Sequence, residues 1–206
     1  MIDIYGTPNS RSTRVLWCAE ELGIEYNFKK VDFSSGENKS DAYLAINPAG
    51  KTPAIVDGDF VLSESTAILE FLAQEYGKEQ IKPSDKSDNR EKALCAKWCS
   101  FAVCELEQPL WTMAKHSFIY PEDMRQDGIL PVCQKEFQNA LSVLSQQLDS
   151  NEYLLGEVFS IADILISHTL AWALSFQQEI PQSNLMSYVQ RCTSRPAFKM
   201  AQQREL

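Results

Sequence analysis

The pattern of the sequence changes once, near residue 77, and this change limits the chain to a two-part architecture. Residues 1–76 alternate quickly between short apolar runs typical of strands and runs with helical spacing, in the order strand, helix, strand, then strand, strand, helix. Residues 77–89 are polar and rich in breakers, which is typical of an exposed linker. Only helical spacing follows. We therefore predict an α/β domain over residues 1–76, a linker over 77–89 and an all-helical domain over 90–206.

Local signals support both domains. The Asp57-Gly58-Asp59 turn separates two runs of β-formers and predicts a hairpin. In the helical part, Ser160 and Asp163 have the spacing of a capping box before a run, 161–174, that is apolar nearly all round. Two helical stripes are expected to be buried: Leu94, Trp98 and Phe101 in one, and Phe137, Leu141, Leu144 and Leu148 in the other.

Charge and cysteine usage narrow the classes of partner. The formal net charge is −9 and no run of Lys or Arg forms a basic stripe, so nucleic acid is not expected as a partner. No leader pattern and no long apolar stretch occur, so we expect a cytoplasmic protein that does not enter a membrane. Six cysteines in 206 residues are far from the density of a disulfide scaffold. Cys95, Cys99 and Cys104 include no Cys-x-x-Cys pair, so they are expected to be helix-core thiols and not a metal site.

Three polar segments of the first domain could each hold part of a peptide-like anion. Segment 9–13 opens the first helix, where a thiolate would be stabilised by the helix N-terminus and by the Ser10 hydroxyl. Segment 47–53 ends at Pro53, and a cis peptide bond there would free the backbone of Thr52 for an extended ligand. Segment 63–66 could bind a carboxylate through Ser65 and an ammonium through Glu64. Plain helix caps and an ordinary strand-edge proline explain the same residues equally simply.

The set of segments resembles the cytosolic glutathione transferases, over nearly the whole chain. The residues that carry the resemblance are Tyr5-Gly6-Thr7-Pro8-Asn9-Ser10, segment 47–53, segment 57–65 followed by Ala67-Ile68, and the capping box Ser160-Ile161-Ala162-Asp163. The likeness is to serine-type, bacterial-like members. It implies a thioredoxin-like N-terminal domain joined to an all-α domain, glutathione as co-substrate, no metal, a homodimer, and a role in detoxification.

The resemblance also assigns roles to individual residues. Ser10 falls where serine-type members hold the glutathione sulfur, Tyr5 falls where tyrosine-type members place a phenol, and Ser12 ranks third for the same role. The implied glutathione-binding residues are Asn38, Lys39, Lys51, Thr52, Pro53, Glu64 and Ser65. In the helical domain, Trp111, His116 and Phe118 are candidates for the electrophile site, although ordinary helix residues would give the same pattern.

The expected reaction is attack by the glutathione thiolate on a hydrophobic, electrophilic small molecule, in a cleft between the two domains. Two alternatives remain open. A glutathione-dependent isomerase or peroxidase could use the same thiolate. A non-catalytic protein-binding adaptor could use the same fold, because a fold does not determine a function.

Overall fold

The computed structural model describes residues 1–77, 81, 83 and 87–206. The chain divides into two compact units. Unit 1 consists of Met1–Asp88 together with Thr193–Leu206, and unit 2 consists of Asn89–Cys192.

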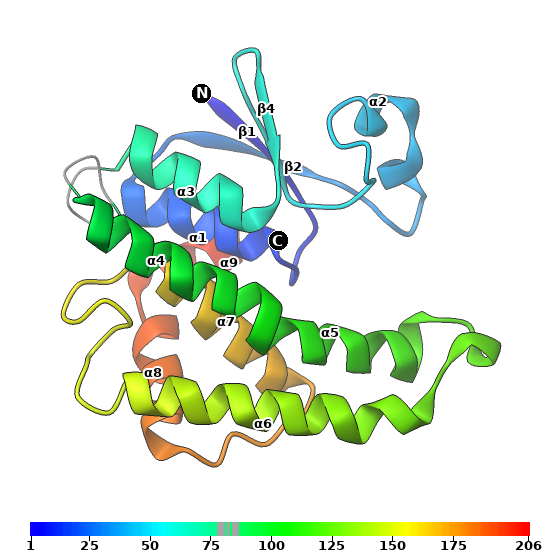
Figure 1. Ribbon diagram of the computed structural model, residues 1–206. Coiled ribbons are helices and arrows are strands. Elements are labelled where there is room, and N and C mark those ends of the chain that lie inside the picture. The colour runs from blue at the N-terminus through cyan, green and yellow to red at the C-terminus, as the bar shows by residue number, and fades with distance from the viewer. Residues whose placement is uncertain (78–80, 82, 84–86) are drawn as a thin grey trace. The chain divides into compact units, whose positions relative to one another are not determined.

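Unit 1 is built on a four-stranded mixed sheet with the order β2-β1-β3-β4 (Figure 1). The strands are β1 (Ile2–Gly6), β2 (Tyr26–Lys30), β3 (Ala54–Asp57) and β4 (Phe60–Ser63). β1 pairs in parallel with β2, and the other two pairs are antiparallel. Asp57 pairs with Phe60 across the predicted hairpin, and Gly58 takes the positive φ of 64° that the tight turn requires. The predicted hairpin is confirmed.

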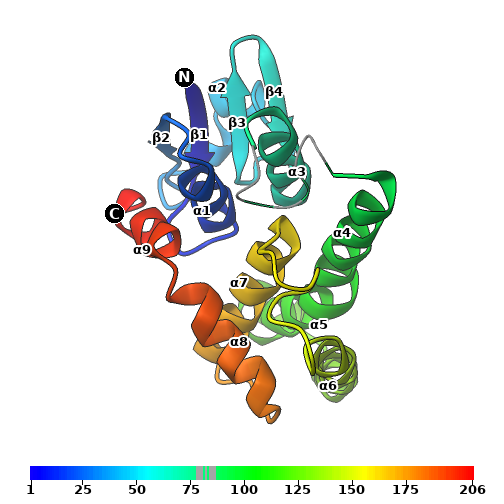
Figure 2. The ribbon, with the colours of Figure 1, turned by 90° about the vertical axis from the view of Figure 1, so that its left-hand side faces the viewer.

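The core of unit 1 lies between one face of the sheet and two helices. α1 (Ser12–Leu22) and α3 (Ser65–Glu75) lie side by side on that face, as Figure 2 shows. Side chains alternate along β1, so Ile2 and Ile4 point into this core while Asp3 and Tyr5 lie on the opposite face. A 3₁₀ turn, η1 (Glu37–Lys39), and the short helix α2 (Asp41–Leu44) follow β2. The strand and helix order predicted for the first 76 residues is confirmed.

The last helix, α9 (Pro196–Arg204), belongs to unit 1 and not to the helical unit. It packs along α1 (Figure 2). The rings of Trp17 and Phe198 lie 4.7 Å apart between centroids, and Arg195 forms a two-pronged ion pair with Glu21 at 2.6 and 2.8 Å. The predicted boundary, with all of 90–206 in one helical domain, is therefore wrong for residues 193–206. Amphipathic spacing shows that a helix has an apolar face but not which unit covers that face.

The predicted linker over 77–89 falls partly outside the described residues. Of those that are described, Ile81 is fully buried and Ser87 is nearly so. α4 already begins at Asn89. The prediction of an exposed linker is thus wrong at these positions, because a polar average over the segment hid single residues that pack against the fold.

Unit 2 is helical in its described regular elements, apart from an isolated bridge between Tyr153 and Gly156. The elements are α4 (Asn89–Phe101), the π-helical η2 (Ala102–Glu107), α5 (Gln108–Ala114), the π-helical η3 (Lys115–Ile119), the 3₁₀ turns η4 (Glu122–Met124) and η5 (Asp127–Ile129), α6 (Leu130–Gln147), α7 (Ile161–Ser175) and α8 (Ser183–Thr193). α6 packs against α5, and α7 packs against α4 (Figure 1). Among the described residues, no helix is both long and apolar enough to cross a bilayer.

Burial within unit 2 confirms one predicted stripe and corrects the other. Phe137, Leu141 and Leu144 are fully buried on α6, and ten residues of α7 are buried. On α4, however, Leu94 is 52% exposed, whereas Trp98 is buried beside Cys95 and Cys99. Thiols occupy the face that the spacing of larger apolar residues assigned to Leu94, because Cys behaves as a small hydrophobic residue in a core.

The capping box predicted at the start of α7 is confirmed. The Asp163 backbone N–H donates to Ser160 Oγ, and the Asp163 carboxylate accepts from the Ser160 backbone N–H at 2.8 Å. The same carboxylate accepts from the Leu154 N–H and from the Tyr188 hydroxyl. The box therefore joins the loop before α7 and helix α8 to the buried helix.

Candidate functional site

Ser10 lies in the loop between β1 and α1. Its Oγ lies 2.5 Å from the Thr7 carbonyl and 3.0 Å from Ser12 Oγ, either of which can accept its proton, and Oγ accepts from the Ser12 backbone N–H at 3.1 Å. The side chain is half-buried. The N-cap of α1 is Arg11, which makes no side-chain cap, so Ser10 is not the N-cap residue. Ser10 thus presents a hydroxyl at the positive end of α1 with part of its surface open to solvent.

Ser12 has a different environment, although it lies only two residues away. It is completely buried, and its Oγ accepts from the Thr7 backbone N–H at 3.1 Å. A Cβ added at Gly6 would lie 2.6 Å from the Cβ of Ser12, so β1 and α1 approach each other closely here. Ser12 therefore holds the loop in place and has no exposed surface that a ligand could touch.

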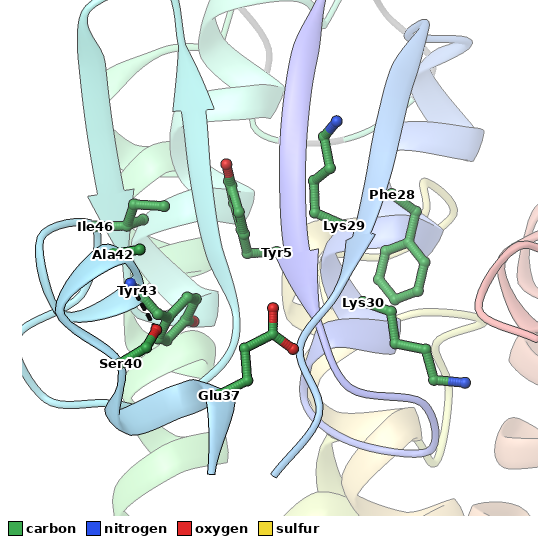
Figure 3. Close-up of a pocket in the computed structure, with 9 residues that line it drawn as sticks. All are labelled: Tyr5, Phe28, Lys29, Lys30, Glu37, Ser40, Ala42, Tyr43 and Ile46. Atoms are coloured by element: carbon green, nitrogen blue, oxygen red, sulfur yellow. Dashed lines mark hydrogen bonds between the residues drawn. The ribbon is translucent and has the colours of Figure 1, made fainter. Parts of the chain in front are cut away.

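Tyr5 faces the side of the sheet opposite Ile4, as strand alternation requires. It lines a cavity of about 420 Å³ together with residues of β2, η1 and α2, including Tyr43, whose ring centroid lies 6.1 Å away (Figure 3). No residue of segment 7–13 lines this cavity. Burial and, secondarily, the charge of Asp3 raise the pKa of Tyr5, so the phenol stays protonated. Tyr5 and Ser10 thus lie in different surroundings.

The strand-entry loop before β3 approaches the Ser10 loop. The Thr52–Pro53 peptide bond is cis, as the resemblance implies. Thr52 Oγ1 lies 3.4 Å from Thr7 Oγ1, which in turn donates to the Val31 carbonyl at 3.0 Å. Thr7 therefore links three segments: its own loop, the end of β2 and the cis-proline loop.

Hydrogen bonds to the backbone carbonyls of Gly50 and Lys51 also stabilise the cis-proline loop. The Lys51 carbonyl accepts from the Tyr43 hydroxyl and from the Asn47 side chain, both at 2.7 Å. Asn38 is buried and donates its amide to the Gly50 carbonyl at 2.8 Å. The side chains of Lys39 and Lys51 are exposed. The ammonium groups of Lys39 and Lys51 are therefore accessible at this loop, whereas the Asn38 amide already donates to the loop backbone.

The third segment lies at the start of α3. Glu64 is exposed and takes a positive φ of 70°, which non-glycine residues rarely adopt outside functional sites. Ser65 is buried as the first residue of the helix. The buried Arg14 of α1 donates to Ser65 Oγ at 3.4 Å. The N-terminal turns of α1 and α3 are thereby tied together within unit 1.

Sequence reasoning missed Thr7 and Arg14, which connect these segments. Arg14 has a detectable signal, because a single arginine beside the apolar run Val15-Leu16-Trp17 indicates a buried donor that needs an acceptor. Thr7 has none, since a threonine after a strand is common in loops. Both residues act through contacts between segments that are distant in sequence.

The three candidates in unit 2 do not share one environment. Phe118 lines a cavity of about 210 Å³ between α5, η3 and α7, where it stacks on Phe176 at 5.5 Å between centroids. His116 lies against Tyr120 and accepts from the Gln126 backbone N–H at 3.1 Å through Nδ1. Neither His116 nor Trp111 lines the cavity. Of the three, Phe118 is the residue best placed to touch an apolar ligand.

The cysteines and metal ligands offer no competing site in the part of the chain that the structure describes. No cluster of three His, Cys, Asp or Glu side chains there could hold a metal ion. Cys95 and Cys99 are buried and Cys104 is exposed, so the three thiols do not face a common point.

Family models match most of the chain. The model described as "Glutathione S-transferase, N-terminal domain" matches residues 2–74, and the model described as "Glutathione S-transferase, C-terminal domain" matches residues 108–196. A similar curated protein is Glutathione S-transferase 3 of Schizosaccharomyces pombe, which is 32% identical over 98% of this chain and 86% of its own length. Glutathione S-transferase F10 of Arabidopsis thaliana is 28% identical over 80% of this chain and 77% of its own length.

Solved structures agree with these matches. A delta-class glutathione transferase of Nilaparvata lugens superposes with a TM-score of 0.87 at 26% identity, covering 100% of this chain and 94% of its own. A glutathione transferase of Phanerochaete chrysosporium, solved in complex with oxidized glutathione, has the same fold, with a TM-score of 0.87 at 24% identity over 99% of this chain and 96% of its own.

Proposed function

Because this chain belongs to the glutathione S-transferase family and is a glutathione transferase, we propose that it is a serine-type enzyme in which Ser10 stabilises the glutathione thiolate. The observation that carries this assignment is the half-buried Ser10 hydroxyl at the front of α1, beside the cis-proline loop. In the proposed reaction, glutathione loses its thiol proton to solvent. Its sulfur then forms a bond to an electrophilic carbon, and a leaving group such as chloride departs with the electron pair of the broken bond.

The thiolate gains stabilisation from two sources. Ser10 can turn its proton from the Thr7 carbonyl toward a sulfur anion, and the N-terminus of α1 carries the partial positive charge of the helix dipole. Lowering a thiol pKa by two units corresponds to about 2.7 kcal/mol, which one charge-assisted hydrogen bond and a helix terminus can supply together. Ser12 is buried and Tyr5 faces another cavity, so both rank below Ser10.

The glutathione peptide would lie along the segments that Thr7 and Arg14 hold together. The Thr52 backbone before Pro53 would pair with the cysteinyl part. Glu64 and Ser65 would bind the γ-glutamyl ammonium and carboxylate.

The glycine carboxylate would meet the two exposed cations of the cis-proline loop, Lys39 and Lys51. Asn38 would contribute by fixing this loop, since its amide already donates to the Gly50 carbonyl.

The electrophile would be a hydrophobic small molecule bound in part by unit 2. Phe118, stacked on Phe176 above a small cavity, offers an apolar and aromatic surface that suits such a molecule. Trp111 and His116 stay candidates. Supporting side chains of this kind select by shape and apolar area, so a broad range of electrophiles is expected.

The proposal also includes that the protein forms a homodimer and is located in the cytoplasm. Unit 1 exposes an aromatic patch at the β3–β4 hairpin and α3: Phe60 is 43% exposed and contacts Phe71, which contacts Tyr76. Exposed apolar patches of this kind mark association surfaces.

All six cysteines are thiols and none is in a disulfide, which suits a reducing compartment.

A conjugation assay with an activated aryl chloride tests the assignment of Ser10. We expect Ser10→Ala to lower kcat/KM about 100-fold, the usual effect of removing one donor to a developing anion, and Tyr5→Phe to retain nearly full activity. Ser12→Ala serves as the control for a general disturbance of the loop. If Ser10→Ala keeps full activity while Tyr5→Phe loses it, the thiolate is held by the phenol and our assignment is wrong.

A further inference from the structure

A buried carboxylate lies at the front of α1, and it comes from the other end of the sequence. Glu205 follows α9 and is only 3% exposed. Its Oε2 accepts from the Thr13 hydroxyl at 2.9 Å, and its carboxylate also accepts from the Asn9 backbone N–H. The pKa of Glu205 is raised by burial, against which these two hydrogen bonds act. Thr13 and Asn9 lie on either side of Ser10.

Glu205 is held in this position by helix α9. Trp17 of α1 packs against Phe198, and Glu21 forms its ion pair with Arg195 at the start of α9. At the other end of α9, Arg204 lies 3.5 Å from Glu20. Contacts at both ends fix the register of α9 along α1, and Glu205 follows directly from it.

The Glu205 carboxylate provides an acidic group near the first turn of α1, which has none of its own. Its N-cap, Arg11, makes no side-chain capping hydrogen bond, and the first turn contains no acidic residue. An anion near a helix N-terminus is stabilising. The N–H groups of Ser12 and Thr13 already have acceptors in Ser10 Oγ and the Ser10 carbonyl. The Glu205 carboxylate instead accepts from the N–H of Asn9, which precedes the helix and lies 196 positions away in the sequence.

The hydrogen bond from the Asn9 N–H to Glu205 lies in the loop that precedes Ser10. Asn9 adopts a positive φ of 55°, so the chain turns sharply immediately before Ser10. A hydrogen bond from its N–H restrains this turn on one side, and the bond from Thr13 restrains the first helical turn on the other.

We propose that Glu205 is a positioning residue for the thiol-activating serine, which it orients by bridging Asn9 and Thr13. This inference rests on the proposed role of Ser10. Glu205 does not touch the sulfur. It acts by holding the Ser10 loop in the arrangement in which the hydroxyl and the helix terminus converge on one anion.

An opposite effect of the same group has to be separated from positioning. A negative charge near a thiolate disfavours that thiolate, so a purely electrostatic role would make Glu205 inhibitory. For a variant that removes the charge but keeps the shape, positioning predicts a glutathione thiol pKa close to that of the wild type, whereas an inhibitory charge predicts a lower one. Glu205→Gln, which retains an acceptor for Thr13, and Glu205→Ala, which retains none, distinguish them.

The experiment measures the pKa of the glutathione thiol in its binary complex, from the ultraviolet absorbance of the thiolate, together with kcat and KM for the aryl chloride reaction. For Glu205→Ala we expect a raised thiol pKa and a kcat lowered about tenfold or more, with a smaller change in KM for glutathione. Glu205→Gln should lie close to the wild type. Leu206→Ala, at a residue that is 92% exposed, is the matched control.

Four outcomes would contradict the proposal or the role of Ser10 on which it rests. A lower thiol pKa and faster turnover in both Glu205 variants would show an inhibitory charge and overturn the positioning role. An unchanged thiol pKa in Glu205→Ala, when Ser10→Ala raises it, would overturn the role of Glu205 and leave that of Ser10 intact. If Ser10→Ala itself leaves the thiol pKa unchanged, the proposed function of Ser10 fails first. The double variant Glu205→Ala/Thr13→Val gives a further test. If each single substitution lowers activity and the two losses of activation free energy add in the double variant, the two residues do not act through one shared bridge, and the proposal is contradicted.

Discussion

At the scale of the residue, identical side chains in this protein have different tasks according to burial. Ser10 and Ser12 are two positions apart, yet one hydroxyl is half-exposed and the other is inaccessible. The sequence gives both the same chemistry. Their difference follows from the close approach of β1 and α1 at Gly6, which buries the Ser12 hydroxyl against the Thr7 backbone and Ser10 Oγ.

Arg14 is expected to affect glutathione binding more than turnover. Its guanidinium donates to Ser65 Oγ from a buried position, and removing it would leave that part of the proposed γ-glutamyl site without this hydrogen bond. For Arg14→Met we expect a loss of glutathione affinity of about ten- to hundredfold, the equivalent of one buried hydrogen bond to a charged group. Calorimetric titration with glutathione measures it.

Lys199→Met, which removes an exposed charge from α9 in the same unit, is the control for Arg14→Met and should bind normally. Equal affinity of Arg14→Met and the wild type, with both folded, would contradict a supporting role for Arg14.

Tyr43 should make unit 1 sensitive to alkali. Burial, with smaller contributions from Tyr5 and Glu37, raises its pKa from 10.0 to about 12. The folded protein therefore holds this phenolic proton more tightly than the unfolded chain. The resulting stabilisation is complete below pH 10 and is lost as the pH rises toward 12, so the free energy of unfolding falls across that window.

Denaturant unfolding of Tyr43→Phe and the wild type across this pH range measures the effect. The variant loses the hydrogen bond to the Lys51 carbonyl at every pH, so its value at neutral pH is the baseline. We expect the gap between the two proteins to narrow above pH 10. Parallel curves would show that the hydroxyl of Tyr43 does not contribute to the alkaline loss.

At the scale of the element, local signals located most helices and strands but not all of their faces. The hairpin at Gly58 and the capping box at Ser160 were predictable, because each depends on residues within a few positions of one another. The buried face of α4 was not, since the choice between Leu94 and Cys95 depends on what packs against the helix. Periodicity defines candidate faces, and tertiary contacts choose among them.

The capping box of α7 is expected to be a major local determinant of the stability of unit 2. Asp163 is completely buried and accepts from Ser160, Leu154 and Tyr188. We expect Ser160→Ala to lower the free energy of unfolding by about 1–2 kcal/mol, and Asp163→Ala by about 3 kcal/mol or more because several buried donors lose their acceptor.

Urea unfolding followed by circular dichroism measures the effects of the capping-box variants. Ser175→Ala, an exposed serine at the other end of α7, is the matched control and should change stability by less than about 0.5 kcal/mol. If Asp163→Ala has the same free energy of unfolding as the Ser175→Ala control, the hydrogen bonds to this carboxylate are not a significant source of stability.

At the scale of the whole molecule, we expect the aromatic patch of unit 1 to be covered in a homodimer. Phe60→Lys places a charge in the centre of the patch made by Phe60, Phe71 and Tyr76. The variant should shift the mass measured by light scattering toward the monomer, because burying an unpaired charge is unfavourable.

Phe33→Lys is the control for Phe60→Lys, since Phe33 is similarly exposed, at 46%, but lies in the turn after β2. A wild type that is already monomeric at assay concentrations would contradict the proposed homodimer. So would a Phe60→Lys variant with the mass of the control.

The amino-acid sequence by itself determined the sequence of elements, the change from an α/β part to a helical part, and the identity of the polar segments around Ser10, Pro53 and Ser65. These depend on neighbours in the chain: spacing, turn residues and caps. Only the tertiary structure decided that α9 returns to α1, that Ser12 is buried, and that Arg14 and Glu205 form hydrogen bonds with Ser65 and Thr13. Such roles arise from packing between residues far apart in sequence, and the free energy of that packing is not encoded in any local pattern.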